Sequence, residues 1–179
     1  IEQYYAEMVE NMNGITPIDR WDEYEIIRMF GKGLNPTSLK TALNNIEFLV
    51  ESIDSEGDTI RVVEFGPGSG WSTLMLRNKL YEKFKDKNIE IFSIDMSPHS
   101  IVATQNSLDY YQIPWKTEMS PLDISGEGNS ADGINLIVAD FIKFIELQPD
   151  NYFDGFFSSH GTAYLSDGEY EELLMITSK

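Results

Sequence analysis

An apolar run that leads directly into a glycine-rich turn is the feature that most constrains the fold of this chain. Residues 62–71 read VVEFGPGSGW, with glycine at Gly66, Gly68 and Gly70. Three glycines at alternate positions after a buried strand predict a tight turn whose backbone approaches a ligand without an intervening Cβ atom. A helix beginning at this turn would direct its free N–H groups and its positive dipole end at the same point. The sequence therefore predicts a ligand site at the carboxyl end of a parallel strand.

Strands and helices alternate from residue 58 onward. The helix after the glycine turn carries Leu76, Leu80 and Phe84 at four-residue spacing, and Ser97-Pro98 and Ser166 are typical helix starts. The segment 114–132 is polar and is predicted to be a loop. Strands separated by helices indicate right-handed crossovers and a parallel sheet. The predicted fold class is α/β, a Rossmann-like doubly wound sheet, with strands at 60–65, 90–95, 134–141 and 153–159.

The first third of the chain has a different pattern. Helical periodicity over residues 1–12, a shorter helix near 21–30 and a third helix from Asn35-Pro36 precede the first strand. We therefore predict an N-terminal helical cap or lid over residues 1–57 and an α/β core over residues 58–179.

Composition excludes several classes of function. With 179 residues the chain is long enough for one globular domain, and the absence of cysteine excludes a thiolate zinc cluster and a cysteine nucleophile. A net charge of −17 opposes binding of nucleic acid. No apolar run approaches the roughly 20 residues that a membrane span needs, and no signal peptide opens the chain. We expect a cytoplasmic protein without nucleic-acid or membrane partners.

Two features of the turn bear on its ligand. Dinucleotide-binding turns place glycine or alanine at the sixth position, where this chain has the bulky Trp71. Glu64, two residues before the first glycine, suits a ligand with a positive amine better than a pyrophosphate. A nicotinamide dinucleotide is therefore disfavoured.

Four motifs in order resemble those of the class I S-adenosylmethionine-dependent methyltransferases. The motifs are Glu64 before the glycine turn, Asp95 ending the second strand in IDMSP, Asp140-Phe141 after the third strand, and Phe153-Asp154 beginning the fourth. The resemblance covers residues 59–165 and is specific to the superfamily, without indicating a subfamily.

The resemblance implies how S-adenosylmethionine would be held. The glycine turn would hold its methionine end, with Glu64 near the amino group. Asp95 would accept hydrogen bonds from both ribose hydroxyls, and Met96 would lie against the adenine ring. Asp140 would accept from the adenine amine, and the Phe141 backbone N–H would face a ring nitrogen. The predicted cofactor-binding residues are Glu64, Gly66, Gly68, Gly70, Asp95, Met96, Asp140, Phe141 and Ser158. The alternative for Asp95 and Asp140 is that each caps the element after it.

The chemistry of methyl transfer places few demands on the protein. The cofactor is already activated, so the protein mainly aligns the acceptor, and a base is needed only where the acceptor loses a proton. His160, in the turn SSHG after the fourth strand, is the candidate base or hydrogen-bond donor, and its alternative is a loop histidine bonded to backbone. A metal is not supported, because Ser159 stands where metal-assisted relatives carry an aspartate, and the alternative is a metal held by His160 with a nearby carboxylate such as Asp154 or Asp167.

The predicted sheet is shorter than the family's. Family members have seven strands, and this sequence supplies four. We expect the chain to be part of a longer protein in which a C-terminal half or a partner covers the edge of the fourth strand, because natural folds avoid open edges. The predicted function is methyl transfer to a small-molecule or carrier-bound acceptor at O, N or C, with S-adenosylhomocysteine as product. The alternatives are a non-catalytic cofactor-binding module and, less favoured, a nicotinamide-dependent oxidoreductase.

Overall fold

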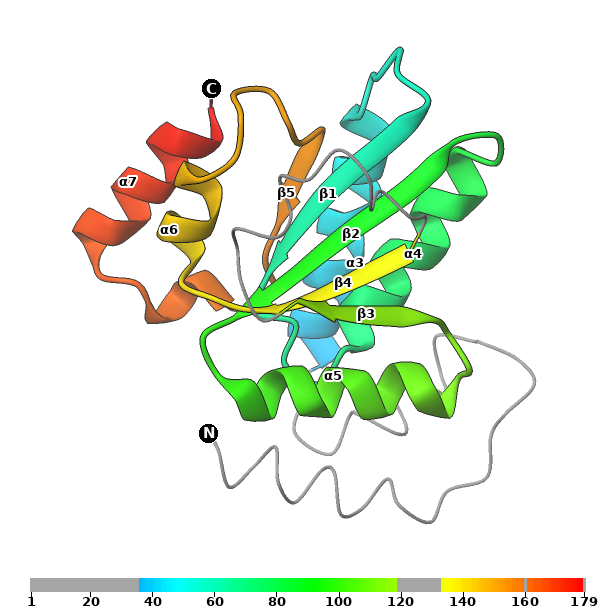
Figure 1. Cartoon of the computed structure of the whole chain (residues 1–179), viewed down its shortest axis with the longest axis horizontal. Coiled ribbons are helices and arrows are strands. Elements are labelled where there is room, and N and C mark those ends of the chain that lie inside the picture. Colours follow the sequence, from blue (N-terminus) through cyan, green and yellow to red (C-terminus); the bar gives the residue numbers. More distant parts are fainter. Residues whose placement is uncertain (1–35, 119–132, 160, 179) are drawn as a thin grey trace.

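The computed structural model describes residues 36–118, 133–159 and 161–178, and they form a parallel sheet between two layers of helices (Figure 1). The sheet has five strands in the order β3-β4-β2-β1-β5, and every pairing is parallel. The strands are β1 Thr59–Phe65, β2 Asn88–Asp95, β3 Trp115–Glu118, β4 Gly133–Val138 and β5 Gly155–Phe157. This confirms the predicted α/β fold with a Rossmann-like, doubly wound sheet.

Helices cover both faces of the sheet. They are α3 Pro36–Ser52, α4 Trp71–Lys83, α5 Pro98–Tyr110, α6 Phe141–Glu146 and α7 Asp167–Thr177, with a short 3₁₀ helix, η2, at Gly161–Tyr164. The helices α3, α4 and α5 lie on one face, and α6 and α7 lie on the other (Figure 1). Described helices offer no segment with the length and apolar character that crossing a membrane requires.

The alternation of side chains along each strand divides the core in two. In β1, Ile60 and Val62 belong to the cluster packed under α3, α4 and α5, whereas Val63 and Phe65 belong to the cluster under α6 and α7. Successive residues of a strand point to opposite faces, so both faces of this strand are buried and its sequence is almost continuously apolar. Its two charged residues are Arg61, which is partly buried, and Glu64, which is fully buried and shares its face with Val62.

The prediction that residues 114–132 form a loop was wrong at its start. Residues Trp115–Glu118 form β3, which pairs with β4 in parallel and makes one edge of the sheet. Three of its four residues are polar, so neither length nor hydrophobic pattern identifies this strand without its partner. The predicted strand 134–141 is also shorter than expected, since β4 ends at Val138 and Asp140 already caps α6.

The third predicted helix of the N-terminal cap packs on the sheet. Ile46 and Val50 of α3 are buried with the β1 core residues, and α3 also contacts α4 and β5. The rest of the predicted cap, residues 1–35, lies outside the described residues, so the division of the chain at residue 57 stays a prediction.

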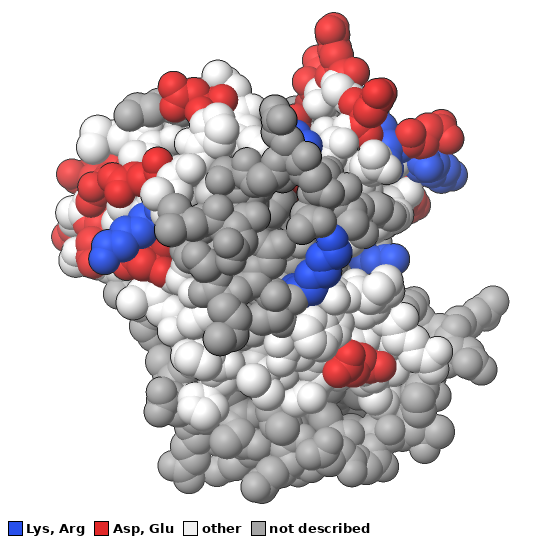
Figure 2. Space-filling model, in the orientation of Figure 1, with Lys and Arg blue, Asp and Glu red and all other residues white. Residues whose placement is uncertain are grey.

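Charge is unevenly spread over the surface. Figure 2 shows acidic side chains gathered around α6 and α7 and near the amino ends of β1 and β2, with few charges over α5. The acidic residues of α7 are Asp167, Glu169, Glu171 and Glu172.

Candidate functional site

The glycine turn between β1 and α4 has the backbone conformation that its sequence predicts. Gly66, Gly68 and Gly70 have φ angles of 72°, 60° and 83°, in the left-handed region that other residues rarely adopt. The Gly70 N–H donates to the Pro67 carbonyl at 2.9 Å, which closes the turn, and Gly70 is the N-cap of α4. The turn therefore delivers the start of α4 to the carboxyl end of β1.

Gly161, which begins the 3₁₀ helix η2 after β5, lies directly against this turn. A Cβ atom on Gly161 would come within 2.4 Å of the Phe65 carbonyl oxygen, and one on Gly66 would come within 2.5 Å of the Gly161 Cα. Ser158 joins the same two strand ends, because its hydroxyl donates to the Phe65 carbonyl and accepts from the Thr162 N–H, both at 3.2 Å. The turns after β1 and β5 thus meet backbone to backbone.

Glu64 is buried under the first turn of α4. Its side chain has no exposed surface. Three hydroxyls donate to its carboxylate, from Ser72 at 2.5 Å, Thr73 at 2.6 Å and Ser93 at 2.8 Å. Glu64 and Ser93 are also direct neighbours in the register of β1 and β2. The carboxylate therefore joins β1, β2 and α4, and its predicted contact with a cofactor's amino group stays a prediction.

Burial has a strong effect on the protonation of Glu64. Desolvation raises its pKa, and the three hydroxyl hydrogen bonds counteract this only in part. The negative charge of Asp95 raises the pKa further. A carboxyl group in such surroundings favours its neutral form more than an exposed glutamate does.

Asp95 ends β2 beside the glycine turn and is half-buried. Its Oδ1 accepts from the Ser97 N–H at 2.9 Å, and its Oδ2 accepts from the Ser100 hydroxyl at 2.6 Å. Burial raises the pKa of Asp95, and these hydrogen bonds act in the opposite direction. Asp95 therefore does hold the start of α5, as the capping alternative expects. A carboxylate oxygen can accept two hydrogen bonds, so acceptor capacity is left for a ligand.

Ser97 occupies the N-cap position of α5 without capping it. Its side chain makes no cap hydrogen bond, and its hydroxyl oxygen is buried with no hydrogen-bond partner among the residues that the structure describes. The start of α5 is instead tied to Asp95, which accepts from the backbone N–H of Ser97 and from the hydroxyl of Ser100.

The other predicted residues are less closely grouped. Met96 is 60% exposed next to Asp95. Asp140 caps α6 by accepting from the Lys143 N–H at 3.1 Å, so its capping alternative is also realised. The Phe141 ring is buried in the core, with its centroid 5.1 Å from that of Phe65. These placements leave the predicted adenine contacts of Asp140 and Phe141 as predictions.

The described residues do not test the predicted role of His160 as a base. His160 lies outside the described residues. Within residues 36–118, 133–159 and 161–178, no three histidine, aspartate or glutamate side chains are grouped so as to hold a metal ion.

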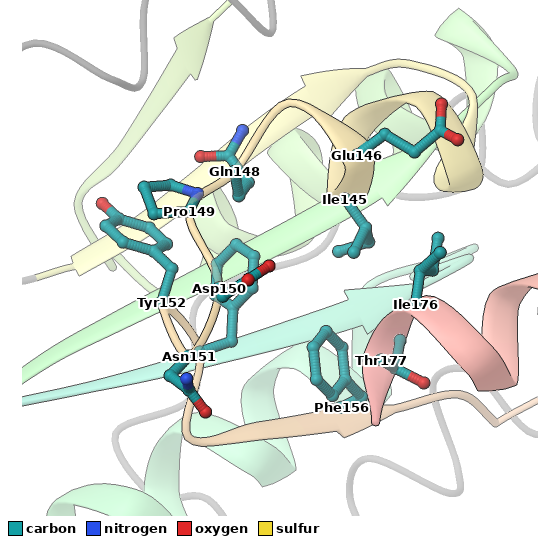
Figure 3. A pocket seen from close by; sticks show the side chains of 11 residues that line it. Ile145, Glu146, Gln148, Pro149, Asp150, Asn151, Tyr152, Phe156, Ile176 and Thr177 are labelled. Carbon is teal, nitrogen blue, oxygen red and sulfur yellow. The ribbon is translucent and has the colours of Figure 1, made fainter. Parts of the chain in front are cut away.

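A cavity of about 440 Å³ lies far from this site. It is lined by the end of α6, the loop before β5 and the last turn of α7, including Tyr152, Phe156 and Ile176 (Figure 3). These loop residues precede β5, so the cavity is at the amino end of a strand parallel to β1. Ligands of open parallel sheets bind at the carboxyl ends of the strands. We therefore place the candidate site at the glycine turn and Asp95.

Sequence analysis did not identify several residues that shape the site. Gly161 could have been recognised as the last residue of SSHG, but a single glycine after a strand gives no indication of what it touches. The hydroxyl residues around Glu64 and Asp95 have no recognisable motif, because serine and threonine near a turn or a helix start usually bond to local backbone, and their presence there does not indicate a distant carboxylate partner. Their importance depends on which strands become neighbours.

Comparison with known proteins does not show the family of this chain. The sequence matches no protein-family model and no curated protein. The chain is similar to a crystal structure from Listeria monocytogenes provisionally assigned as a class I S-adenosylmethionine-dependent methyltransferase, with 11% sequence identity and a TM-score of 0.49. That match covers 93% of this chain and 42% of the other, so this chain spans less than half of that protein's length. The functional argument therefore depends on the residues of the site itself.

Glu64→Gln should change how stability depends on pH. The pKa of Glu64 is raised on folding, so above the ordinary glutamate value of about 4.3 the folded state holds a proton that the unfolded state has lost. The free energy of unfolding of the parent should therefore fall as pH rises through this window, and Glu64→Gln should fall less. Urea denaturation between pH 4 and pH 8 measures the difference.

A variant of Glu169 is the contrasting control. Its pKa is lowered by hydrogen bonds from Ser166, so its contribution to stability is lost as pH falls below the ordinary glutamate value. The plot of unfolding free energy against pH for Glu169→Gln should differ in slope from that of the parent only below the ordinary glutamate pKa. Parallel curves for the parent and Glu64→Gln would contradict the buried, raised-pKa description of Glu64.

Gly161→Ala should destabilise the protein through a steric clash with the β1 turn. The new Cβ meets backbone atoms of Phe65 and Gly66, which cannot move aside as a flexible side chain does, so we expect a loss of about 1–3 kcal/mol. Gly168→Ala is the matched control, since a Cβ there has no atom within 4 Å, and alanine favours the helix by up to about 1 kcal/mol. Equal unfolding free energies for the two variants would refute the close contact.

Proposed function

We propose that this protein binds S-adenosylmethionine and transfers its methyl group to a small-molecule or carrier-bound acceptor at oxygen, nitrogen or carbon. The observation that carries the proposal is the position of Asp95. Its half-buried carboxylate ends β2 directly beside the strand that leads into the positive-φ glycine turn. A carboxylate there suits a pair of ribose hydroxyls, and the exposed Met96 side chain suits an adenine ring.

The residues present fit this cofactor in chemical character. Two ribose hydroxyls that donate to Asp95 would stabilise its ionised form. They would therefore counteract the rise in its pKa that burial causes. When bound, S-adenosylmethionine supplies a methyl group already activated by its sulfonium. The task of the chain is then to orient the cofactor and the acceptor and to exclude water, effects that together contribute on the order of 7–11 kcal/mol in well-aligned reactions.

The nature of the acceptor follows from charge. A protein with a net charge of −17 disfavours polyphosphate and nucleic-acid acceptors and favours neutral or cationic ones. His160 is the proposed base or hydrogen-bond donor, required only where the acceptor atom carries a proton at the start of the reaction.

Asp95→Asn should weaken binding of S-adenosylmethionine. Loss of the negative acceptor removes charge-assisted hydrogen bonds worth about 1.5–3 kcal/mol, which corresponds to roughly 10- to 150-fold in dissociation constant. Asp58→Asn is the matched control, because Asp58 is exposed and lies before the amino end of β1. Isothermal titration calorimetry of both variants measures the effect, and equal affinities would remove Asp95 from the site.

The same titrations separate the alternative functions. Binding of S-adenosylmethionine and S-adenosylhomocysteine, with no binding of NAD, supports the proposal. Binding of NAD alone would replace it with a nicotinamide enzyme. Binding of S-adenosylmethionine without turnover on any of a panel of phenol, amine and carboxylate acceptors would favour a non-catalytic binding module.

We also propose that a C-terminal continuation or a partner covers the free edge of β5. β5 pairs with β1 on one side and with no described strand on the other. Its residues Gly155–Phe157 carry no charge, whereas the opposite edge strand carries the exposed Lys116. Charged residues are a common protection of sheet edges. On neighbouring α7, Leu174 and Met175 are 52% and 63% exposed.

The isolated chain should therefore associate with itself through this region. Sedimentation velocity over a range of concentrations should show association that the double substitution of Leu174→Glu and Met175→Glu reduces. Val102→Glu adds the same kind of charge at an exposed position on α5 and should have no effect. A chain that stays monomeric and melts in one cooperative transition would contradict the proposal.

A further inference from the structure

One face of α5 carries three buried hydroxyl side chains. Ser100, Thr104 and Ser107 are spaced by four and three residues, so they share one face of the helix. None of them has exposed surface. Hydroxyl residues within a helix often bond to its own carbonyls or face solvent. These three instead reach residues that follow two different strands.

The first two contacts hold the glycine turn. Ser107 Oγ lies 2.5 Å from the Ser69 carbonyl oxygen and 3.2 Å from the Ala103 carbonyl oxygen, and since a hydroxyl has one hydrogen we assign it to the nearer acceptor. Thr104 Oγ1 donates to the Gly68 carbonyl at 3.2 Å. Thr104 also packs so closely that a Cβ on Gly70 would lie 3.0 Å from its Cγ2.

The third contact holds the carboxylate. Ser100 Oγ is 2.6 Å from Asp95 Oδ2 and 3.4 Å from the Gly68 carbonyl oxygen. It therefore donates to Asp95 and lies beside the turn. A single helix face thus contacts both the turn that follows β1 and the carboxylate that ends β2.

We propose that this face of α5 is a positioning element that fixes the glycine turn and Asp95 relative to each other, so that one ligand can engage both. The inference rests on the proposed function in naming S-adenosylmethionine as that ligand. Thr104 and Ser107 act through the turn and need not touch the ligand themselves. The carbonyls of Gly68 and Ser69 are held toward α5, so small rotations of these peptide units are restrained before a ligand arrives. A preorganised turn binds its ligand without the cost of ordering it.

The test compares variants that lose the hydroxyls with one that keeps them. Thr104→Val is nearly isosteric and removes one donor, and combining it with Ser107→Ala removes both. We expect the affinity for S-adenosylmethionine to fall about threefold in the single variant and about tenfold in the double variant, since each hydrogen bond contributes a factor of a few. Thr104→Ser keeps the donor and should bind as the parent does.

Ile101→Val controls for a general loosening of α5. Ile101 is a buried residue of the same helix that belongs to the apolar core, and its loss of one methyl group should lower the melting temperature without changing affinity. Unchanged affinity in the double variant, or equal loss in Ile101→Val, would overturn the positioning role while leaving the proposed function intact. Should the double variant fail to fold, Thr104→Val alone decides.

Amide hydrogen exchange of the ligand-free protein gives a readout that is independent of the cofactor. Residues 68–70 should exchange faster in the double variant than in the parent, and Ile101→Val should not change their exchange relative to the rest of α5. Equal exchange rates of residues 68–70 in the double variant and in Ile101→Val would overturn the inference. A parent that binds no S-adenosylmethionine would refute the proposed function, and the exchange experiment would still decide whether α5 fixes the turn.

Discussion

The left-handed backbone of the glycine turn is the constraint around which the carboxyl end of the sheet is built. Gly66, Gly68 and Gly70 have positive φ angles, so the chain reverses within five residues and brings α4 back onto the sheet over β2. The turn is tight on two sides, because Gly161 touches it from beyond β5 and Thr104 touches it from α5. A side chain at Gly66 or Gly70 would meet both backbone strain and a neighbour. The residues around the turn therefore restrict its backbone to a single conformation.

The buried Glu64 carboxyl group couples that turn to the rest of the fold. A buried charge is costly unless it is hydrogen-bonded, and the hydroxyls of Ser72, Thr73 and Ser93 supply those bonds from α4 and β2. Asp95 and Glu64 also repel each other, which raises the pKa of Glu64. A cationic ligand next to Asp95 would reduce this repulsion.

Much of the fold was predictable from sequence, and the connections within the site were not. The order strand, glycine turn and helix is local information, and residues 62–71 contain all of it. The strand Trp115–Glu118 forms only through pairing with β4, a separate segment of the chain. Its own four residues show no hydrophobic pattern that would identify a strand. Likewise, Asp95 is recognisable at the end of a strand. Its hydrogen bond to Ser100, and the contact between Gly66 and Gly161, arise only once the parallel sheet brings separate turns together.

The two faces of the sheet differ in chemical character. Under α4 and α5, the carboxyl half of the core is polar, with hydroxyls that reach Glu64, Asp95 and the glycine turn. Under α6 and α7, the core is aromatic, with Phe65, Phe92 and Phe153 in mutual or neighbouring ring contacts. Apolar packing tolerates substitutions that conserve volume, whereas a polar network is weakened by the loss of one partner. The face under α4 and α5 therefore holds the hydroxyl network around the candidate site, and the face under α6 and α7 is built mainly from aromatic packing.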